Sequence, residues 1–175
     1  MAKLRPIQDG KVFCTKCRVF KFPEEFNKSN NEKNTLKLTY LCKLCAKQKI
    51  HEYRNTEVGF WVSVWNNLVG SSKSRNLELE ITKEDIKKLW EKQGGLCAIT
   101  HLPMELAKSQ KITRSRSYSP YRMSVDRIDN NIGYKKSNIR LVCAYVNVMR
   151  MDMTDQQLKF WCEAVIKGMN DGKCI

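Results

Sequence analysis

Apolar side chains recur every three or four residues in a segment near the middle of the chain. Over residues 60–69 this spacing predicts a helix, and a turn rich in serine and lysine is expected over residues 70–75. We assign the tryptophans of this helix to the hydrophobic core, because tryptophan side chains are highly buried on average. The predicted buried face consists of Phe60, Trp61, Val64, Trp65 and Leu68.

A second helix is predicted over residues 83–93, and the sequence marks both of its ends. Thr82 is the expected N-cap, and Asp85 at the third helical position completes an approximate capping box. The helix should end at Gly94 and Gly95, because glycine adopts the backbone angles that terminate helices at little cost.

The segment over residues 124–150 predicts a strand, a polar turn and a second strand that leads into a helix. Apolar and polar residues alternate over 124–128, a turn follows at 129–131, and a second apolar run covers 139–142. Residues 143–150 then have helical spacing. That spacing buries Cys143, Val146 and Met149 and leaves Asn147 and Arg150 on another face.

A last helix is predicted over residues 156–166, after a capping segment at 153–155, and its apolar face holds Leu158, Trp161, Cys162 and Val165. Together these elements predict an α+β fold. The expected parts are a four-cysteine module over 1–58, a helical scaffold over 59–95, a strand–strand–helix core over 96–150 with a basic loop over 107–123, and a C-terminal helix and tail over 151–175.

The charge of the chain indicates its kind of partner. The 175 residues include 32 Lys and Arg against 18 Asp and Glu, a formal net charge of +14. The excess is concentrated in residues 1–58 and 96–150, which carry +7 each. Clustered positive charge favours a polyanion, since neutralising phosphates releases condensed counterions. A basic, solubilising surface without a specific partner is the alternative.

Eight cysteines are many for a chain of this length, and inside a cell they indicate metal ligation more than disulfides. Four of them form two Cys-x2-Cys pairs, Cys14 with Cys17 and Cys42 with Cys45. Two such pairs complete a tetrahedral Zn²⁺ shell, and because protein fills all four positions, the predicted zinc is structural. Two disulfides or a redox dithiol are the weaker alternative.

Asp126 on the first predicted strand and Asn147 on the following helix form a candidate site for a second kind of metal ion. Oxygen ligands suit a hard cation such as Mg²⁺ that keeps several waters. Beside basic residues, such an open site suits metal-assisted hydrolysis of a phosphodiester. On spacing alone, an Asp and an Asn in an α+β fold are more often a turn residue and a helix cap.

This segment resembles the motif of the HNH, or ββα-metal, endonucleases. It contains Val125-Asp126-Arg127, Gly133-Tyr134, the run over residues 138–143, and Asn147, in the order and spacing of the family's rare-cutting, PacI-type restriction enzymes. The N-terminal cysteine pairs and the Gly-Gly-Leu-Cys run over 94–97 are similar to phage-type HNH proteins. The resemblance implies a ββα-metal core and an enzyme that hydrolyses phosphodiester bonds in double-stranded DNA with Mg²⁺ or Mn²⁺, beside one structural Zn²⁺.

The resemblance also implies roles for the matching residues. Asp126 and Asn147 would hold the catalytic metal ion, and Asn138 would brace the loop between strand and helix. Arg127 stands where most of the family has a histidine base. Arginine keeps its proton at physiological pH, so Arg127 would hold the scissile phosphate instead. Water activation then falls to Tyr134, which would have to lose its proton, or to a hydroxide on the metal ion. A degenerate, inactive copy of the family is the alternative interpretation of Arg127.

Basic residues around the motif are the expected DNA contacts, and residues 107–123, which contain no acid, are interpreted as an arm that reaches phosphates. The PacI-type proteins have a second zinc held by four cysteines, of which only Cys97 and Cys143 remain here, so we expect these two to be small buried residues instead. The predicted DNA-contacting set is Lys108, Lys111, Arg114, Arg116, Arg122, Lys135, Lys136, Arg140 and Arg150.

Two classes of function stay open: an active DNA endonuclease, and an HNH-fold protein that binds nucleic acid or serves a structural role without cutting. A zinc-ribbon regulator whose C-terminal half only dimerises is a third. The intact set of Asp126, Arg127, Tyr134 and Asn147 favours the endonuclease.

No apolar run is long enough to span a bilayer, and the first residues lack the apolar segment of a signal peptide. We therefore expect no membrane partner and an intracellular location, in the cytoplasm of a bacterial or phage-infected cell or in a nucleus. The recognition sequence, the choice between nicking and double-strand cleavage, and homodimer formation do not follow from the sequence.

Overall fold

The computed structural model describes residues 5–106 and 119–172, and the chain divides into two compact units, Met1–Tyr53 and Arg54–Ile175. Each unit has its own hydrophobic cluster. None of the helices in the described ranges is long and apolar enough to cross a membrane.

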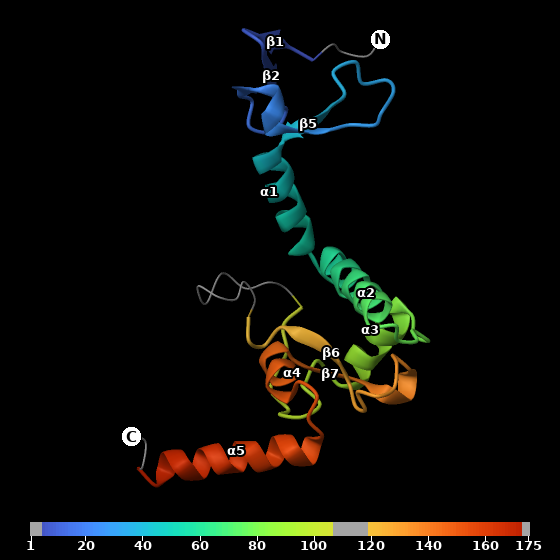
Figure 1. Cartoon of the computed structure of the whole chain (residues 1–175), viewed down its shortest axis with the longest axis vertical. Helices are drawn as coiled ribbons and strands as arrows, with labels where there is room; N and C mark the ends of the chain where they lie inside the picture. The colour runs from blue at the N-terminus through green and yellow to red at the C-terminus, as the bar shows by residue number, and fades with distance from the viewer. Residues whose placement is uncertain (1–4, 107–118, 173–175) are drawn as a thin grey trace. The chain divides into compact units, whose positions relative to one another are not determined.

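The first unit is small and forms around its cysteines. An antiparallel three-stranded sheet is followed by a single 3-10 turn, a two-stranded antiparallel sheet and a helix (Figure 1). Val12 and Phe26 pack with Cys14, Cys42 and Cys45 in its buried cluster. The elements are β1 (Ile7–Gln8), β2 (Lys11–Phe13), β3 (Phe20–Lys21), η1 (Pro23–Glu25), β4 (Phe26–Lys28), β5 (Leu38–Cys42) and α1 (Lys43–Arg54).

The second unit places two helices, an antiparallel hairpin and a short helix around one core (Figure 1). The core takes side chains from the first two helices of this unit, from both strands of the hairpin and from the segments between these elements. The elements are α2 (Glu57–Ser74), α3 (Lys83–Lys92), β6 (Met123–Arg127), η2 (Lys136–Asn138), β7 (Ile139–Cys143), α4 (Ala144–Arg150) and α5 (Asp155–Asn170).

The predicted α+β composition is confirmed, and so are the ends of α3. The Thr82 hydroxyl accepts a hydrogen bond from the Asp85 backbone N–H, while the Asp85 carboxylate accepts one from the Thr82 backbone N–H. Gly94 and Gly95 follow the helix with φ angles of +61° and +71°. The order of strand, strand and helix over residues 123–150 is also as predicted.

The prediction of a turn over residues 70–75 is wrong, because α2 continues to Ser74. A glycine inside a helix costs only about 1 kcal/mol relative to alanine, so Gly70 does not end this one. Packing offsets that cost, since Leu68 and Ser72 are both buried on the same side of the helix. Thr56 caps the N-terminus by accepting a hydrogen bond from the Gly59 N–H, which starts the helix earlier than predicted.

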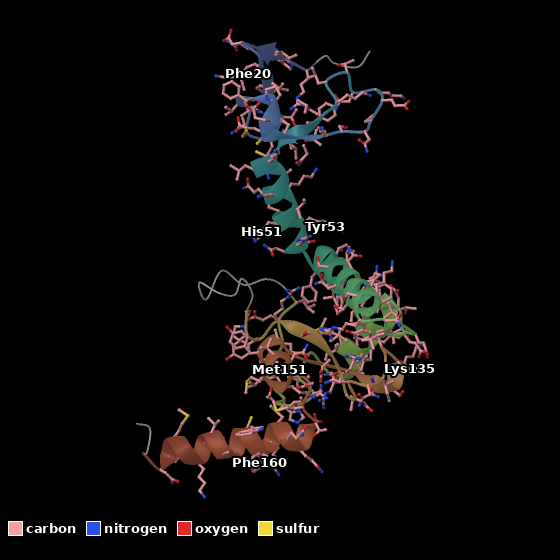
Figure 2. All side chains as sticks on the ribbon, in the orientation of Figure 1. Phe20, His51, Tyr53, Lys135, Met151 and Phe160 are labelled. Carbon is pink, nitrogen blue, oxygen red and sulfur yellow. The ribbon has the colours of Figure 1, made fainter. Side chains whose placement is uncertain are left out.

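The predicted buried face of α4 is wrong in part, and the apolar face of α5 is mostly exposed. On α4, Met149 is 54% exposed and Arg150 only 1% exposed, the reverse of the expectation, because Arg150 finds buried acidic and carbonyl partners. On α5, only Leu158 is buried, whereas Trp161 is 58% exposed. Helix α5 contacts α4, and Figure 2 shows Phe160 projecting from α5. Nothing in the described residues covers the rest of its apolar face.

Candidate functional site

Strand β6, the segment after it and α4 contribute to the lining of a cavity of about 950 Å³. Among the residues that line it are Asp126, Arg127, Tyr134 and Asn147. The fifth expected active-site residue, Asn138, lies in the segment that connects the two strands. The fold therefore brings together residues that are spread over 22 positions of the sequence, because β7 pairs with β6 and leads directly into α4.

Asp126 is the most constrained side chain of this lining. It is 3% exposed, and the strand register places it directly opposite Arg140. Its Oδ2 accepts a hydrogen bond from Arg140 Nε at 2.9 Å, and its Oδ1 accepts one from an Arg150 guanidinium nitrogen at 2.8 Å. Each carboxylate oxygen is thus engaged by one cation.

A second carboxylate closes these contacts into a ring. Asp155, the first residue of α5, binds Arg140 through two hydrogen bonds of 2.6 Å and accepts another from Arg150 at 3.3 Å. The hydrogen bonds with Arg140 lower the pKa of Asp155, and those with Asp155 are the largest influence that raises the pKa of Arg140. We call Asp126, Arg140, Arg150 and Asp155 the charge ring.

The charge ring corrects two predicted DNA contacts. Arg150 is almost fully buried and also donates to the backbone carbonyls of Arg127 and Ile128. Arg140 has a side chain that is only 13% exposed and binds two carboxylates. Neither guanidinium is available to phosphate, because breaking a buried ion pair leaves an uncompensated charge.

Asn147 projects from α4 toward the strand that carries Asp126. Its amide nitrogen donates to the Ser124 hydroxyl at 2.7 Å and, more weakly, to the Val125 carbonyl at 3.4 Å. Its amide oxygen makes no hydrogen bond within the described residues. Asp126 and Asn147 line the same cavity with oxygen ligands, so the donor set fits a hard divalent cation that keeps most of its water.

Arg127 lines the cavity from the end of β6. Its guanidinium donates to the carbonyls of Asn130 and Ile132 at 2.9 and 3.0 Å and lies 5.5 Å from the centre of the Tyr134 ring. The residue is 8% exposed, yet no carboxylate of the described residues forms an ion pair with it. The Arg127 guanidinium is thus held by two backbone carbonyls and has no anionic partner among residues 5–106 and 119–172.

Asn138 holds the loop between the strands in one shape. Its side-chain amide nitrogen donates to three loop carbonyls, and its oxygen accepts a hydrogen bond from the Asp129 N–H. Beside it, Gly133 allows the backbone of Tyr134 to pair with Glu78 and Glu80. A β-carbon at Gly133 would lie 2.5 Å from the Glu78 carbonyl oxygen, so any larger residue would displace Tyr134.

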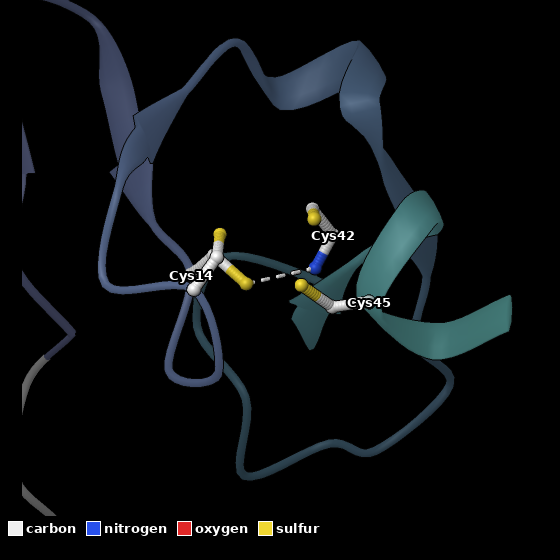
Figure 3. A group of neighbouring side chains, drawn as sticks. Cys14, Cys42 and Cys45 are labelled. Atoms are coloured by element: carbon white, nitrogen blue, oxygen red, sulfur yellow. Dashed lines mark hydrogen bonds between the residues drawn. The ribbon is translucent and has the colours of Figure 1, made fainter. Parts of the chain in front are cut away.

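The four N-terminal cysteines form the second candidate site. The Sγ atoms of Cys14, Cys17, Cys42 and Cys45 all lie within 4.8 Å of one another, and Figure 3 shows three of these side chains converging. Tetrahedral zinc–sulfur bonds of 2.3 Å place sulfurs about 3.8 Å apart, so the cluster fits one zinc ion. It is the one group of three or more His, Cys, Asp or Glu with metal-ligand geometry in the described residues.

The thiols of this cluster are unequal in acidity. Burial raises the pKa of Cys14, but hydrogen bonds from the backbone N–H groups of Cys42, Cys17 and Lys16 bring it down to about 6. Burial and then hydrogen bonds with the other cysteines raise the pKa of Cys45 to about 12. A bound divalent ion favours the thiolate at every position.

Cys97 and Cys143 are buried in the core of the second unit, as predicted. The Cys143 backbone N–H donates to the Cys97 sulfur at 3.4 Å, which joins the segment after α3 to the start of α4. No third ligand accompanies them in the described residues. Cys162 is half-buried rather than a core residue.

The remaining basic residues that were expected to contact DNA differ in their partners and positions. Lys135 pairs with Glu78 and Glu80, and Lys136 pairs with Asp85. Arg122 lines the cavity with its guanidinium 5.3 Å from the Phe60 ring centre. Four expected contacts lie outside the described residues: Lys108, Lys111, Arg114 and Arg116.

Sequence reasoning missed two parts of the site. The first is Asp155, which closes the charge ring. An acidic residue at a helix N-terminus is common, so its presence in the sequence did not indicate this role. Asn67, Ser71 and Arg75 from α2 form the opposite wall of the cavity. Their spacing of four residues was a signal, but the prediction ended that helix at residue 69.

No family model matches the chain, and no curated protein matches its sequence. Among solved structures, the chain is similar to one whose title describes DNA perturbation by the rare-cutting HNH restriction endonuclease PacI. The TM-score is 0.44 and the identity 19%, over 89% of this chain and 94% of that one. A likeness at this level carries no conclusion by itself, so the function is argued from the site.

We predict that the purified chain binds one zinc ion, and that Cys42→Ser abolishes this binding. Metal ligation and folding are coupled in such small units, so amide hydrogen exchange should also speed up within residues 5–53. Elemental analysis measures the zinc, and Cys162→Ser is the matched control that should retain it. Two tightly bound zinc ions per chain would contradict the prediction.

We predict that Arg150→Met lowers the free energy of unfolding by about 3–5 kcal/mol, because Asp126 loses a buried partner. Asp155→Asn should lower the free energy of unfolding by less, on the order of 1 kcal/mol, because the Asp155 carboxylate is half exposed. Denaturant unfolding measures both changes. The control is Glu163→Gln, which removes an exposed α5 carboxylate 3.7 Å from Lys159. If Asp155→Asn were as neutral as this control, the charge ring would not hold α5.

Proposed function

We propose that this protein is a metal-dependent endonuclease that hydrolyses phosphodiester bonds in DNA. The observation that carries the proposal is Arg127, a nearly buried cation that no carboxylate of the described residues pairs with, in the same cavity as two oxygen ligands for a hard cation. Such a cavity can bind a phosphate group at the arginine and, beside it, the divalent cation that activates this phosphate for hydrolysis.

The argument for an anionic substrate is electrostatic. Removing a guanidinium from water is costly unless it is paired, and the carbonyls of Asn130 and Ile132 satisfy only part of Arg127. A phosphodiester supplies the missing charge and accepts hydrogen bonds from the guanidinium fork. The net charge of +14 and the two basic parts of the chain support DNA as the polymer that carries it.

The roles follow from the positions of the side chains. Asp126 and Asn147 would hold Mg²⁺ or Mn²⁺, which supplies Lewis-acid stabilisation of the phosphate when bound. Arg127 would hold a phosphate oxygen and stabilise the negative charge that grows on it during attack. Tyr134 lies against Arg127 in the same cavity, so its hydroxyl is the candidate group on this chain for receiving a proton from water.

A second candidate function has an observation in its favour. Both oxygens of Asp126 already accept hydrogen bonds from arginines, as expected of a structural carboxylate in a protein that binds DNA without cutting it. An ionised carboxylate has about four lone-pair sites, however, and these two hydrogen bonds occupy two of them. A cation can therefore share Asp126 with the charge ring, and we place the endonuclease first.

We predict that the protein nicks or linearises supercoiled plasmid with Mg²⁺ or Mn²⁺ and not with EDTA. Asn147→Ala should reduce cleavage by at least about 100-fold, because it removes a ligand of the activating ion. It is a sharper test than Asp126→Ala, which also leaves Arg140 and Arg150 without their buried partner. Calorimetric titration with Mn²⁺ should show weakened binding in the folded variant.

The outcomes separate the two candidates. Cleavage by folded Asn147→Ala at the rate of the unaltered protein would remove the metal site from the mechanism. A protein that binds plasmid but never cuts it, with any divalent ion, would establish the non-cleaving alternative. Met149→Ala is a matched control, because Met149 is an exposed residue of α4 two positions from Asn147 and is not part of the cavity lining.

We further predict that Arg127→Ala lowers kcat by about 10²–10³-fold with little change in DNA affinity, as when a transition-state contact is lost. Arg127→His should retain part of the activity, because histidine can act as a base. Tyr134→Phe removes one hydroxyl and keeps the packing. Near-normal cleavage by Tyr134→Phe would exclude Tyr134 as the base and leave the roles of Arg127 and the metal ligands unchanged.

A further inference from the structure

The cavity has a second wall that the proposed mechanism does not use. Helix α2 contributes Asn67, Ser71 and Arg75 to the lining, facing the wall that carries Asp126 and Asn147. These three residues are separated by four positions each, so they form one row along the helix and its C-cap. We call them the α2 row.

The row borders the core without being part of it. Val64 and Leu68, on the adjoining face of α2, are buried in the hydrophobic cluster and also line the floor of the cavity. Asn67 and Arg75 are exposed, and Ser71 is half-buried. The helix therefore presents an apolar floor and a polar edge to the same space.

The side chains of the row make no hydrogen bonds or ion pairs with other described residues. Arg75 differs in this from Lys135 and Lys136, whose ammonium groups bind nearby carboxylates. A guanidinium, an amide and a hydroxyl are all donors that bind phosphate oxygens in protein–DNA complexes. The donors of the row are therefore available to a ligand in the cavity.

The length of the row matches a short stretch of a nucleic-acid strand. Eight residues of helix span about 12 Å at 1.5 Å per residue. Successive phosphates of one strand advance about 3.4 Å along a duplex axis, so the row covers about three to four nucleotides. A strand whose scissile phosphate reaches Arg127 would thus have neighbouring phosphates beside α2.

We propose that the α2 row is a binding track for the DNA strand that is cut, in which Arg75, Ser71 and Asn67 contact phosphates that flank the scissile one. This inference rests on the proposed function, because it takes the substrate to be DNA. Contacts with phosphates position the DNA backbone but do not distinguish one base from another. The track therefore contributes to affinity for DNA of any sequence.

The test compares matched substitutions on α2. Arg75→Ala and Lys73→Ala remove one positive charge each, two residues apart near the same helix terminus, but only Arg75 lines the cavity. Asn67→Asp and Asn66→Asp likewise add one negative charge at adjacent exposed positions, of which only Asn67 is in the row. Binding of the full chain to a short mixed-sequence DNA duplex is measured without added Mg²⁺ or Mn²⁺, and without a chelator that would remove the zinc, over a range of salt concentrations.

We expect Arg75→Ala to weaken binding about tenfold at low salt and to reduce the slope of log affinity against log salt by about one. Asn67→Asp should weaken binding similarly, while Lys73→Ala and Asn66→Asp should change it less than twofold. If both variants of each matched pair lost DNA affinity equally, the cause would be a general effect of net charge, and the inference would be overturned. Unchanged binding in all four variants would also overturn it.

The result is independent of cleavage. If the unaltered protein cuts plasmid and the α2 variants bind DNA normally, the proposed function stands and the track is wrong. If the protein never cuts but Arg75→Ala and Asn67→Asp selectively lose affinity, the track stands in a protein that binds DNA without cleaving it.

Discussion

The buried carboxylate of Asp126 is the constraint on which the second unit depends. Arg150 is among the most buried side chains of the chain, and a guanidinium can occupy that position only with an anionic partner. Asp126 supplies it, and at the same time binds Arg140 across the hairpin. Asp155 then ties both arginines to the start of α5. Asp126 thus fixes the relation of β6, β7 and α4, and Asp155 adds α5 to them.

The same ring sets the electrostatics of the cavity. Two arginines and two aspartates neutralise one another, so the charge of Asp126 does not repel a phosphate as a free carboxylate would. The other formal charges on the cavity lining are those of Arg75, Arg122 and Arg127 against Asp152. The cavity is therefore net positive and is also lined by Asp126 and Asn147, a combination that agrees with the proposed binding of a polyanion and a divalent cation.

Local sequence signals predicted the elements of this core well. The capping box of α3 and its glycine terminus depend on interactions within a few residues, which the sequence contains in full. The spacing of the four cysteines likewise predicted a cluster that the structure shows within 4.8 Å. The end of α2 was predicted wrongly, because burial of Leu68 and Ser72 against the core outweighs the local cost of Gly70.

By itself the sequence determined the order of the elements, the cysteine cluster and the candidate set of Asp126, Arg127, Tyr134 and Asn147. Only the tertiary structure decided which basic residues line the cavity and which are held in ion pairs. Arg140 and Arg150 look no different from Arg75 along the chain, yet the strand register and the buried face of α4 pair the first two with Asp126. Arg75 lines the cavity because α2 packs its apolar face on the hairpin core. The role of a charged side chain depends on partners distant in sequence, and local patterns do not contain them.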